Sequence, residues 1–196
     1  MEIVGIVGGI ASGKTCAADL FGELGAAVVD ADGIGHQVLC EPEIRQAAEN
    51  RWGDKILDAA GKIDRQRLAA IVFDDQEELT FLGNLTHPRI REQLLAELDR
   101  LREKEIPVVI LDAALLLETD WHSLCQKIVF IETSPEIREK LAADRGWKKE
   151  ELIRRESRQI SLEKKRAVAD YTIHNNGSVE ALRKEISRVW DSLQAI

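Results

Sequence analysis

The sequence is poor in the residues that build disulfide frameworks and metal clusters. It contains only three cysteines, Cys16, Cys40 and Cys125, which lie far apart and form no C-x-x-C pair. This pattern argues against disulfide bonds and against a zinc site, so we expect all three to be small buried hydrophobic residues. The four histidines have no metal-ligand spacing either, and each is expected to be structural or exposed.

Long apolar runs are also absent. No uncharged apolar stretch approaches the roughly 18 residues that cross a bilayer, so we expect no membrane-spanning segment. Residues 1–9 lack the basic start and long apolar core of a signal peptide, and these absences together predict a cytoplasmic protein. Hydrophobic residues make up 44% of the chain, which is ordinary for a globular protein. A length of 196 residues suits a single domain over residues 1–196.

Basic residues do not balance the acidic ones, and the formal net charge is -8. An acidic chain is a poor general binder of nucleic acid, because contacts with phosphates need clustered Lys and Arg. We therefore expect neither a nucleic-acid nor a membrane partner. The sequence predicts no particular oligomeric state.

Short apolar runs alternate with helical patterns along the chain, which predicts an α/β fold. Continuous apolar strands of this kind belong to a parallel sheet with helices on both faces, here with five strands. Residues 32–105 are mostly helical and are interpreted as an insertion beside the sheet. The expected strands are residues 2–7, 26–30, 108–111, 128–131 and 171–173.

Several helix signals lie between these strands. Residues 13–24 follow the first strand as a helix, and Ser134 with Pro135 has the form of a helix N-cap and first turn. His87 and Pro88 also stand at an expected helix start. Two apolar stripes at helical spacing are Ile90, Leu94, Leu95, Leu98 and Leu101, and then Val179, Leu182, Ile186, Val189, Trp190 and Leu193.

Residues 8–15 read GGIASGKT and match the P-loop pattern G-x-x-x-x-G-K-[ST] between a strand and a helix. Glycines let backbone N–H groups approach phosphate oxygens, and the helix N-terminus adds its dipole. Lys14 is expected to reach the β- and γ-phosphates of ATP, and the Thr15 hydroxyl to bind Mg²⁺. Kinases, GTPases and motor ATPases share this loop. The residues expected to bind the nucleotide here are Gly9, Ala11, Ser12, Gly13, Lys14, Thr15 and Cys16.

Two carboxylates follow expected strands. Asp32 comes after the second strand, where a carboxylate could deprotonate or orient a substrate hydroxyl, and a helix N-cap is an equal alternative. Asp112 follows four apolar residues in a Walker B arrangement, where it could help to hold Mg²⁺ or could cap a turn.

Residues 138–166 form a basic segment in an acidic chain, with eleven Lys and Arg against six Asp and Glu. A solvated helical face would explain such a segment. Its place between the fourth and fifth strands also fits the lid of a small-molecule kinase, which needs arginines to neutralise the transferring phosphoryl group. Arg145, Arg155 and Arg158 are the candidates.

Four segments, in order, resemble the dephospho-coenzyme A kinase family. The P-loop resembles that family's G-G-I-G-S-G-K-S, and residues 29–32 (VDAD) its D-A-D segment. Residues 85–90 (LTHPRI) resemble its H-P motif, and residues 170–177 (DYTIHNNG) its A-D-x-x-I-D-N-x-G ending. The departures are Ala11 for a glycine, Thr15 for serine, His174 for Asp, and residues 113–118 (AALLLE) for P-L-L-F-E.

This resemblance implies a P-loop NTPase-type kinase that uses MgATP to phosphorylate the ribose 3′-hydroxyl of dephospho-coenzyme A. It implies that Asp32 acts on that hydroxyl, that His87 contacts the acceptor and that Arg145 belongs to the lid. Arg155 and Asn175 would lie around ATP, with Asn175 by the adenine. It also makes residues 32–105 the acceptor-binding insertion. The rival functions are a kinase for a nucleoside or nucleotide, and a non-catalytic nucleotide switch.

Overall fold

The computed structural model describes residues 1–194, and these divide into two compact units. The first unit consists of Met1–Asp30 and the residues from Asp99 onward, and the second is Ala31–Leu98. Within the described residues no helix is long and apolar enough to cross a membrane.

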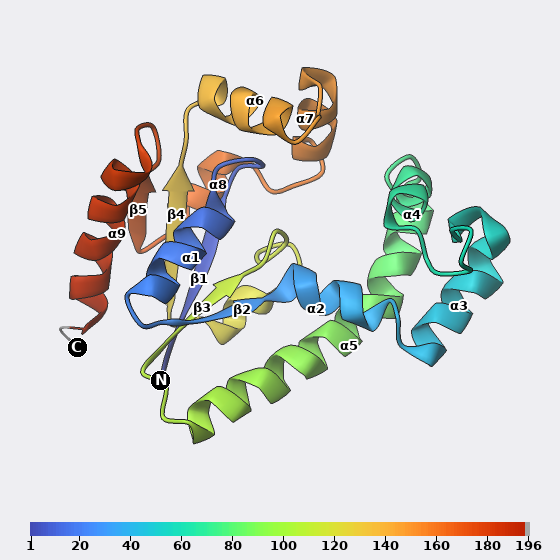
Figure 1. The fold of residues 1–196 in the computed structure, drawn as a ribbon, viewed down its shortest axis with the longest axis horizontal. Coiled ribbons are helices and arrows are strands. Elements are labelled where there is room, and N and C mark those ends of the chain that lie inside the picture. The colour runs from blue at the N-terminus through green and yellow to red at the C-terminus, as the bar shows by residue number, and fades with distance from the viewer. Residues whose placement is uncertain (195–196) are drawn as a thin grey trace. The chain divides into compact units, whose positions relative to one another are not determined.

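The first unit is built on a five-stranded parallel sheet with the order β2-β3-β1-β4-β5 (Figure 1). The five predicted strands are confirmed, each within one residue or so of its expected ends. The strands are β1 (Glu2–Gly8), β2 (Ala27–Asp30), β3 (Val108–Asp112), β4 (Lys127–Glu132) and β5 (Tyr171–His174).

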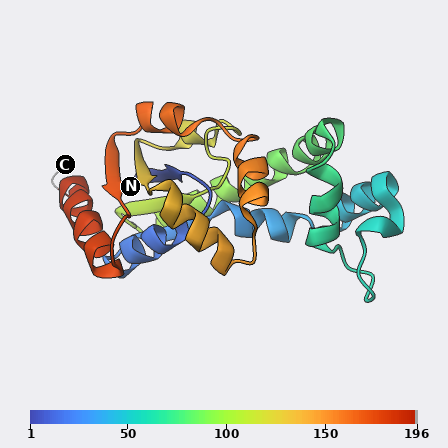
Figure 2. The ribbon, with the colours of Figure 1, turned by 90° about the horizontal axis from the view of Figure 1, so that it is seen from above.

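Helices cover both faces of this sheet, as predicted (Figure 2). Alternate strand residues such as Val4, Ile110 and Val129 pack with α1 and α9 in one buried core on one face. On the other face, α8 contacts β1, and Arg166 of α8 lies over the Phe130 ring. The helical segments of this unit are α1 (Lys14–Glu23), η2 (Trp121–Leu124), α6 (Pro135–Asp144), α7 (Lys149–Glu156), α8 (Leu162–Ala167) and α9 (Val179–Gln194).

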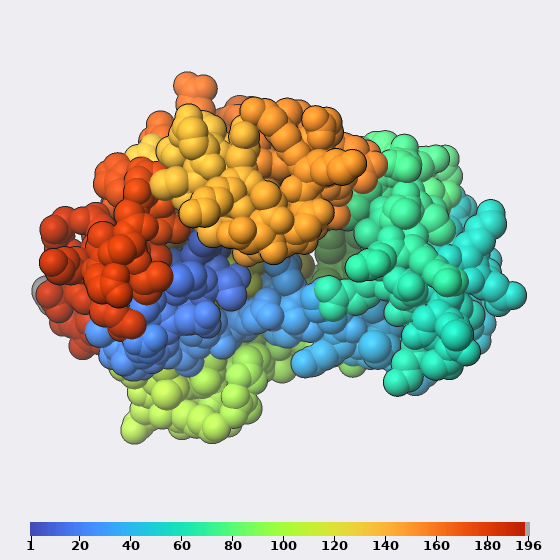
Figure 3. Space-filling model, turned by 45° about the horizontal axis from the view of Figure 1, so that its top comes forward, coloured from blue at the N-terminus to red at the C-terminus, as the bar shows by residue number. Residues whose placement is uncertain are grey.

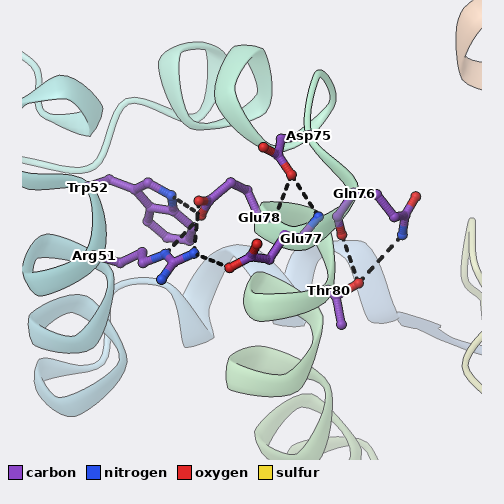
Figure 4. A network of polar contacts seen from close by, with 7 residues as sticks. All are labelled: Arg51, Trp52, Asp75, Gln76, Glu77, Glu78 and Thr80. Atoms are coloured by element: carbon purple, nitrogen blue, oxygen red, sulfur yellow. Dashed lines mark hydrogen bonds and ion pairs between the residues drawn. The ribbon is translucent and has the colours of Figure 1, made fainter.

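The second unit is helical and has its own buried core around Trp52, Ile56 and Leu68. At its surface Arg51 forms ion pairs with Glu77 and Glu78, and the Trp52 ring N–H donates to Glu78 (Figure 4). Its segments are α2 (Ala31–Val38), α3 (Pro42–Trp52), η1 (Gly53–Ile56), α4 (Arg65–Val72) and α5 (Gln76–Glu103), the last of which continues into the first unit.

Several local predictions are confirmed and others are wrong. Ser134 caps α6 by accepting from the Ile137 N–H. The expected helix start at Pro88 is wrong, because α5 runs through this proline from Gln76 to Glu103. Val179 is 53% exposed and does not join the apolar face of α9, since it stands at the first residue of that helix. Cys40 is exposed rather than buried.

Candidate functional site

The loop between β1 and α1 has a closely defined backbone. Ala11 and Gly13 adopt positive φ angles of 57° and 87°. Gly13 tolerates this left-handed conformation freely, whereas Ala11 adopts it against the crowding of its Cβ. The Ser12 backbone N–H donates to the Gly9 carbonyl at 3.2 Å and closes the turn. A turn of this kind before a helix leaves unpaired N–H groups and a positive dipole end for an anion.

Two side chains from neighbouring strand ends hold this loop at Ser12. The Thr133 hydroxyl, just after β4, donates to the Ser12 carbonyl at 2.8 Å. The Asn175 amide, just after β5, donates to the same carbonyl at 2.9 Å. A Cβ on Gly13 would come within 2.5 Å of the Asn175 amide nitrogen, so only glycine fits there. The carboxyl ends of β4 and β5 therefore support the loop from outside.

The polar side chains that end the loop are also paired. The Lys14 ammonium donates to the Gly9 carbonyl at 2.9 Å, and the Thr15 hydroxyl donates to Asp112 Oδ2 at 2.9 Å. Cys16 follows them in the first turn of α1, half-buried. Burial, with the nearby Asp19 and other charges, raises the pKa of the Cys16 thiol.

Asp112 closes β3 and is only 8% exposed. Burial raises the pKa of its carboxyl, while the Thr15 hydrogen bond and the Lys14 charge act in the opposite direction. Asp30, its register partner on β2, adds to the increase. A hydroxyl and a carboxylate in contact are suitable oxygen ligands for Mg²⁺, which in kinases takes its remaining ligands from phosphates and water. Among the residues that the structure describes, no group of three or more His, Cys, Asp or Glu could hold a metal alone.

The segment after β4 packs directly on the loop. Figure 3 shows the α6–α7 segment (orange) beside the N-terminal segment (dark blue). Ala11 is buried in one apolar cluster with Ala142 of α6 and Leu152 of α7. Both ends of the predicted lid are anchored, because Arg138 and Lys165 are 7% and 2% exposed.

The lid arginines have different surroundings. Arg145 is exposed at the end of α6. Arg155 pairs with Glu151 at 2.6 Å, and its guanidinium lies over the Trp147 ring, 4.4 Å from the centroid. Arg158 is exposed just after α7. These positions leave Arg145 accessible to a ligand, whereas Arg155 is oriented by its own neighbours.

A cavity of about 330 Å³ lies beside Gly9 at the ends of β4 and β5. Arg138 lines it and lies so close to the loop that a Cβ on Gly9 would come within 2.8 Å of its guanidinium. The same guanidinium forms an ion pair with Glu156 of α7, and burial lowers its pKa. The other lining residues include Thr133, Ser134, Arg166 and Asn176.

The second unit carries the two predicted acceptor residues. Asp32 is exposed in the first turn of α2, which begins at Ala31, so its alternative role as N-cap is wrong. An acid in this turn still favours the helix through the dipole. His87 lies within α5, and burial lowers the pKa of its imidazole. Its ring packs over Gly83, where a Cβ would come within 3.0 Å.

Comparison with known proteins identifies the family. Residues 2–181 match the family model described as dephospho-CoA kinase. The chain belongs to the dephospho-CoA kinase family. The curated dephospho-CoA kinase of Corynebacterium diphtheriae is 37% identical over 193 residues, covering 97% of this chain and 96% of its own. The solved dephospho-CoA kinase from Campylobacter jejuni superimposes with a TM-score of 0.73 at 26% identity, and the match covers 98% of each chain.

Shikimate kinase from Acinetobacter baumannii has a TM-score of 0.57 at 16% identity, covering all of this chain and 94% of its own. This likeness shows the fold alone, and it confirms the predicted P-loop kinase architecture. Members of the dephospho-CoA kinase family are ATP-dependent phosphotransferases that act in the last step of coenzyme A biosynthesis.

Two residues of the site were not found from the sequence. Thr133 and Arg138 contact the loop from just after β4 and from α6, and no motif marks either of them. In the sequence, Arg138 is one of the eleven basic residues of the segment 138–166, and no motif distinguishes it from the others. The signal that could have found it is its position four residues after the Ser134 cap, one turn into a helix that starts at the sheet edge.

Proposed function

We propose that this chain transfers the γ-phosphoryl group of ATP to the ribose 3′-hydroxyl of dephospho-coenzyme A, giving coenzyme A and ADP. The observation that carries the proposal is the family match over residues 2–181, on a chain whose nucleotide loop is complete. Lys14 and Thr15 stand in that loop beside Gly9 and Asp112.

The loop and its neighbours would hold the nucleotide. Backbone N–H groups of residues 9–16 would bind the phosphates, and Lys14 would neutralise charge on the γ-phosphoryl group as it leaves. Asn175 would lie by the adenine, and its amide already contacts Ser12. Arg155 would lie around ATP, and Arg145 would reach the transferring group when the lid closes.

Thr15 and Asp112 would hold Mg²⁺. The 2.9 Å hydrogen bond from the Thr15 hydroxyl to Asp112 Oδ2 supports this role, because it brings the two oxygen ligands together. A bound Mg²⁺ would supply positive charge that neutralises the phosphate oxygens. A positive charge there would lower the pKa of Asp112 and oppose the effect of burial.

The acceptor would be handled by residues of the second unit. Asp32 would orient or deprotonate the 3′-hydroxyl, and His87 would contact the acceptor. We take the second unit to be the acceptor-binding insertion of one P-loop kinase domain.

We also propose that the protein is cytoplasmic and has neither a nucleic-acid nor a membrane partner.

The proposal can be tested by measuring ADP release with a panel of acceptors that includes dephospho-coenzyme A, adenosine and nucleoside monophosphates. We expect turnover with dephospho-coenzyme A and a phosphate on its 3′-hydroxyl, located by NMR. Equal turnover with a nucleoside monophosphate would reassign the acceptor. ATP binding without transfer to any of them would favour a nucleotide switch.

A further inference from the structure

A buried lysine meets a carboxylate whose side chain is 16% exposed, at the C-terminal end of the predicted lid and apart from the nucleotide loop. Lys165 of α8 is 2% exposed, and its ammonium lies 3.2 Å from Glu118 Oε1. The same ammonium donates to the Gln159 side-chain carbonyl at 2.9 Å. Glu118 belongs to the loop that follows β3, and Gln159 to the connection between α7 and α8.

Two further hydrogen bonds join the same two segments. Glu118 Oε1 also accepts from the Ile160 backbone N–H at 2.9 Å. The Gln159 amide donates to the Ala114 carbonyl at 3.4 Å. We call Glu118, Gln159, Ile160 and Lys165 the clamp. It joins the loop of residues 113–118 to the α7–α8 connection through contacts made from both sides.

Stability alone does not account for the clamp. A buried ion pair loses the hydration of both charges, and apolar residues of similar volume are often as stable or more so. The second carboxylate oxygen of Glu118 is buried and has no hydrogen-bond partner among the described residues. A buried polar network that is only partly satisfied costs stability, and some proteins retain such networks because they fix one geometry.

The clamp fixes the position of one segment that leads from Asp112 relative to another that leads from α7. The loop of residues 113–118 begins directly after Asp112, which contacts Thr15. The α7–α8 connection begins directly after α7, which carries Arg155. The proposed reaction needs the metal-side carboxylate and the lid arginines to act on one phosphoryl group. A misplacement of about 1 Å can reduce such a rate by about 10²-fold.

We infer that Glu118 and Lys165 are positioning residues for phosphoryl transfer. They hold the loop after Asp112 against the base of α7, so that both sides approach the phosphoryl group in one arrangement. This inference rests on the proposed function. It also ends the movable part of the lid before Gln159, ahead of the predicted end at Arg166, because Gln159, Ile160 and Lys165 are all held by the clamp.

The test compares two clamp variants with a matched control. Lys165→Met keeps a long side chain and removes the charge, and Glu118→Gln keeps an acceptor for the Ile160 N–H. The control is Lys127→Met, which breaks a Lys–Asp170 pair of similar length, 3.3 Å, whose lysine is 32% exposed. For each folded variant we would measure kcat, KM for the acceptor, affinity for an ATP analogue, and amide exchange of residues 113–118 and 157–160.

We expect Lys165→Met to lower kcat by about 10-fold or more, with affinity for the ATP analogue within about threefold. Glu118→Gln should act in the same direction but less strongly. Amide exchange should rise in both clamped segments together, even without acceptor. The control should leave kcat within about twofold, as for an exposed pair.

An unchanged kcat in folded clamp variants, with only a lower melting temperature, would show a purely structural pair and overturn the inference. If Lys165→Met does not fold, the Glu118→Gln result decides alone. The wild-type chain tests the proposed function in the same assay. If it prefers another acceptor, the ratio of variant to wild-type turnover on that acceptor still decides the role of the clamp.

Discussion

The two compact units differ in how their candidate site residues are surrounded. In the first unit, the nucleotide loop is held by side chains from three strand ends, with Thr15 on Asp112 and both Thr133 and Asn175 on the Ser12 carbonyl. In the second unit, Asp32 is exposed in a helix turn and His87 is half-buried in another helix. The loop of the first unit is thus fixed by contacts within the protein, whereas Asp32 lies exposed in the first turn of α2.

Asp32→Asn should give the largest effect and the clearest test of this contrast. We expect the rate of transfer to fall by about 10²–10⁴-fold, as for loss of a general base, with ATP binding retained. The unfolding free energy should change by less than about 1 kcal/mol, because Asp32 is an exposed side chain in the first turn of α2, where an acid interacts favourably with the helix dipole. Single-turnover kinetics beside thermal unfolding would measure both.

The matched control for Asp32 is Glu43→Gln, an exposed acid in the first turn of α3. It should change the unfolding free energy by a similar amount and leave the rate unaltered. Wild-type activity in Asp32→Asn, with clear destabilisation, would reverse the contrast and make Asp32 a structural residue.

Lys14→Ala should give the next largest effect, on the organised side of the comparison. We expect the chain to fold and transfer to fall by about 10²-fold or more, as for one preorganised charge contact. The exposed Lys184→Ala is the control and should behave as the wild type. Steady-state kinetics and ATP titration would measure the change, and unaltered values for both would refute the P-loop assignment.

His87 should make the stability of the folded chain sensitive to pH. Its pKa in the folded chain lies below the ordinary 6.5, because burial disfavours the charged imidazole. The unfolded chain therefore takes up the proton first, and the unfolding free energy should fall as the pH drops below about 6.5 towards the folded pKa.

Urea unfolding at about pH 7.5 and pH 5.5 would measure this loss, which His87→Gln should reduce. His122→Gln, at an exposed histidine, is the control and should keep the wild-type difference. If His87→Gln retains the full wild-type difference, His87 is not the group responsible.

Ala11→Gly should give the smallest effect. Glycine would relieve a left-handed alanine, worth about 1–2 kcal/mol. It would also lose a buried methyl group worth about 0.8 kcal/mol and add about 0.5–1 kcal/mol of chain entropy. These terms nearly cancel, so we expect the unfolding free energy to change by less than about 1 kcal/mol, measured by denaturant titration.

The loss of the methyl group should nevertheless be visible at the lid. Since Ala11 packs on Ala142 and Leu152, amide exchange in α6 and α7 should rise. Unchanged exchange there would show that the apolar cluster does not couple the nucleotide loop to α6 and α7, and that the loop is held by its polar contacts alone.

The sequence by itself determined the strand positions and the loop, because each depends on residues close together in the chain. The parallel arrangement followed from the alternation of continuous apolar strands with helices. Apolar runs define the five strands, and the spacing of Gly8, Gly13 and Lys14 defines the turn before α1. The resemblance of four ordered segments pointed to the family that the comparisons then confirmed. The local sequence pattern was misleading at Pro88. This proline lies inside the long helix α5, although proline usually starts or breaks a helix.

The tertiary structure alone decided which distant side chains support the loop and which charges are buried. Thr133, Arg138 and Lys165 carry no local signal, since threonine, arginine and lysine side chains are mostly exposed to solvent. Their burial depends on strand order and helix packing, which bring residues more than 100 positions apart within hydrogen-bond distance, as for Thr133 and Ser12. Folding removes these polar groups from water, and they then need hydrogen-bond partners inside the protein. Only the complete fold decides which distant residues supply those partners.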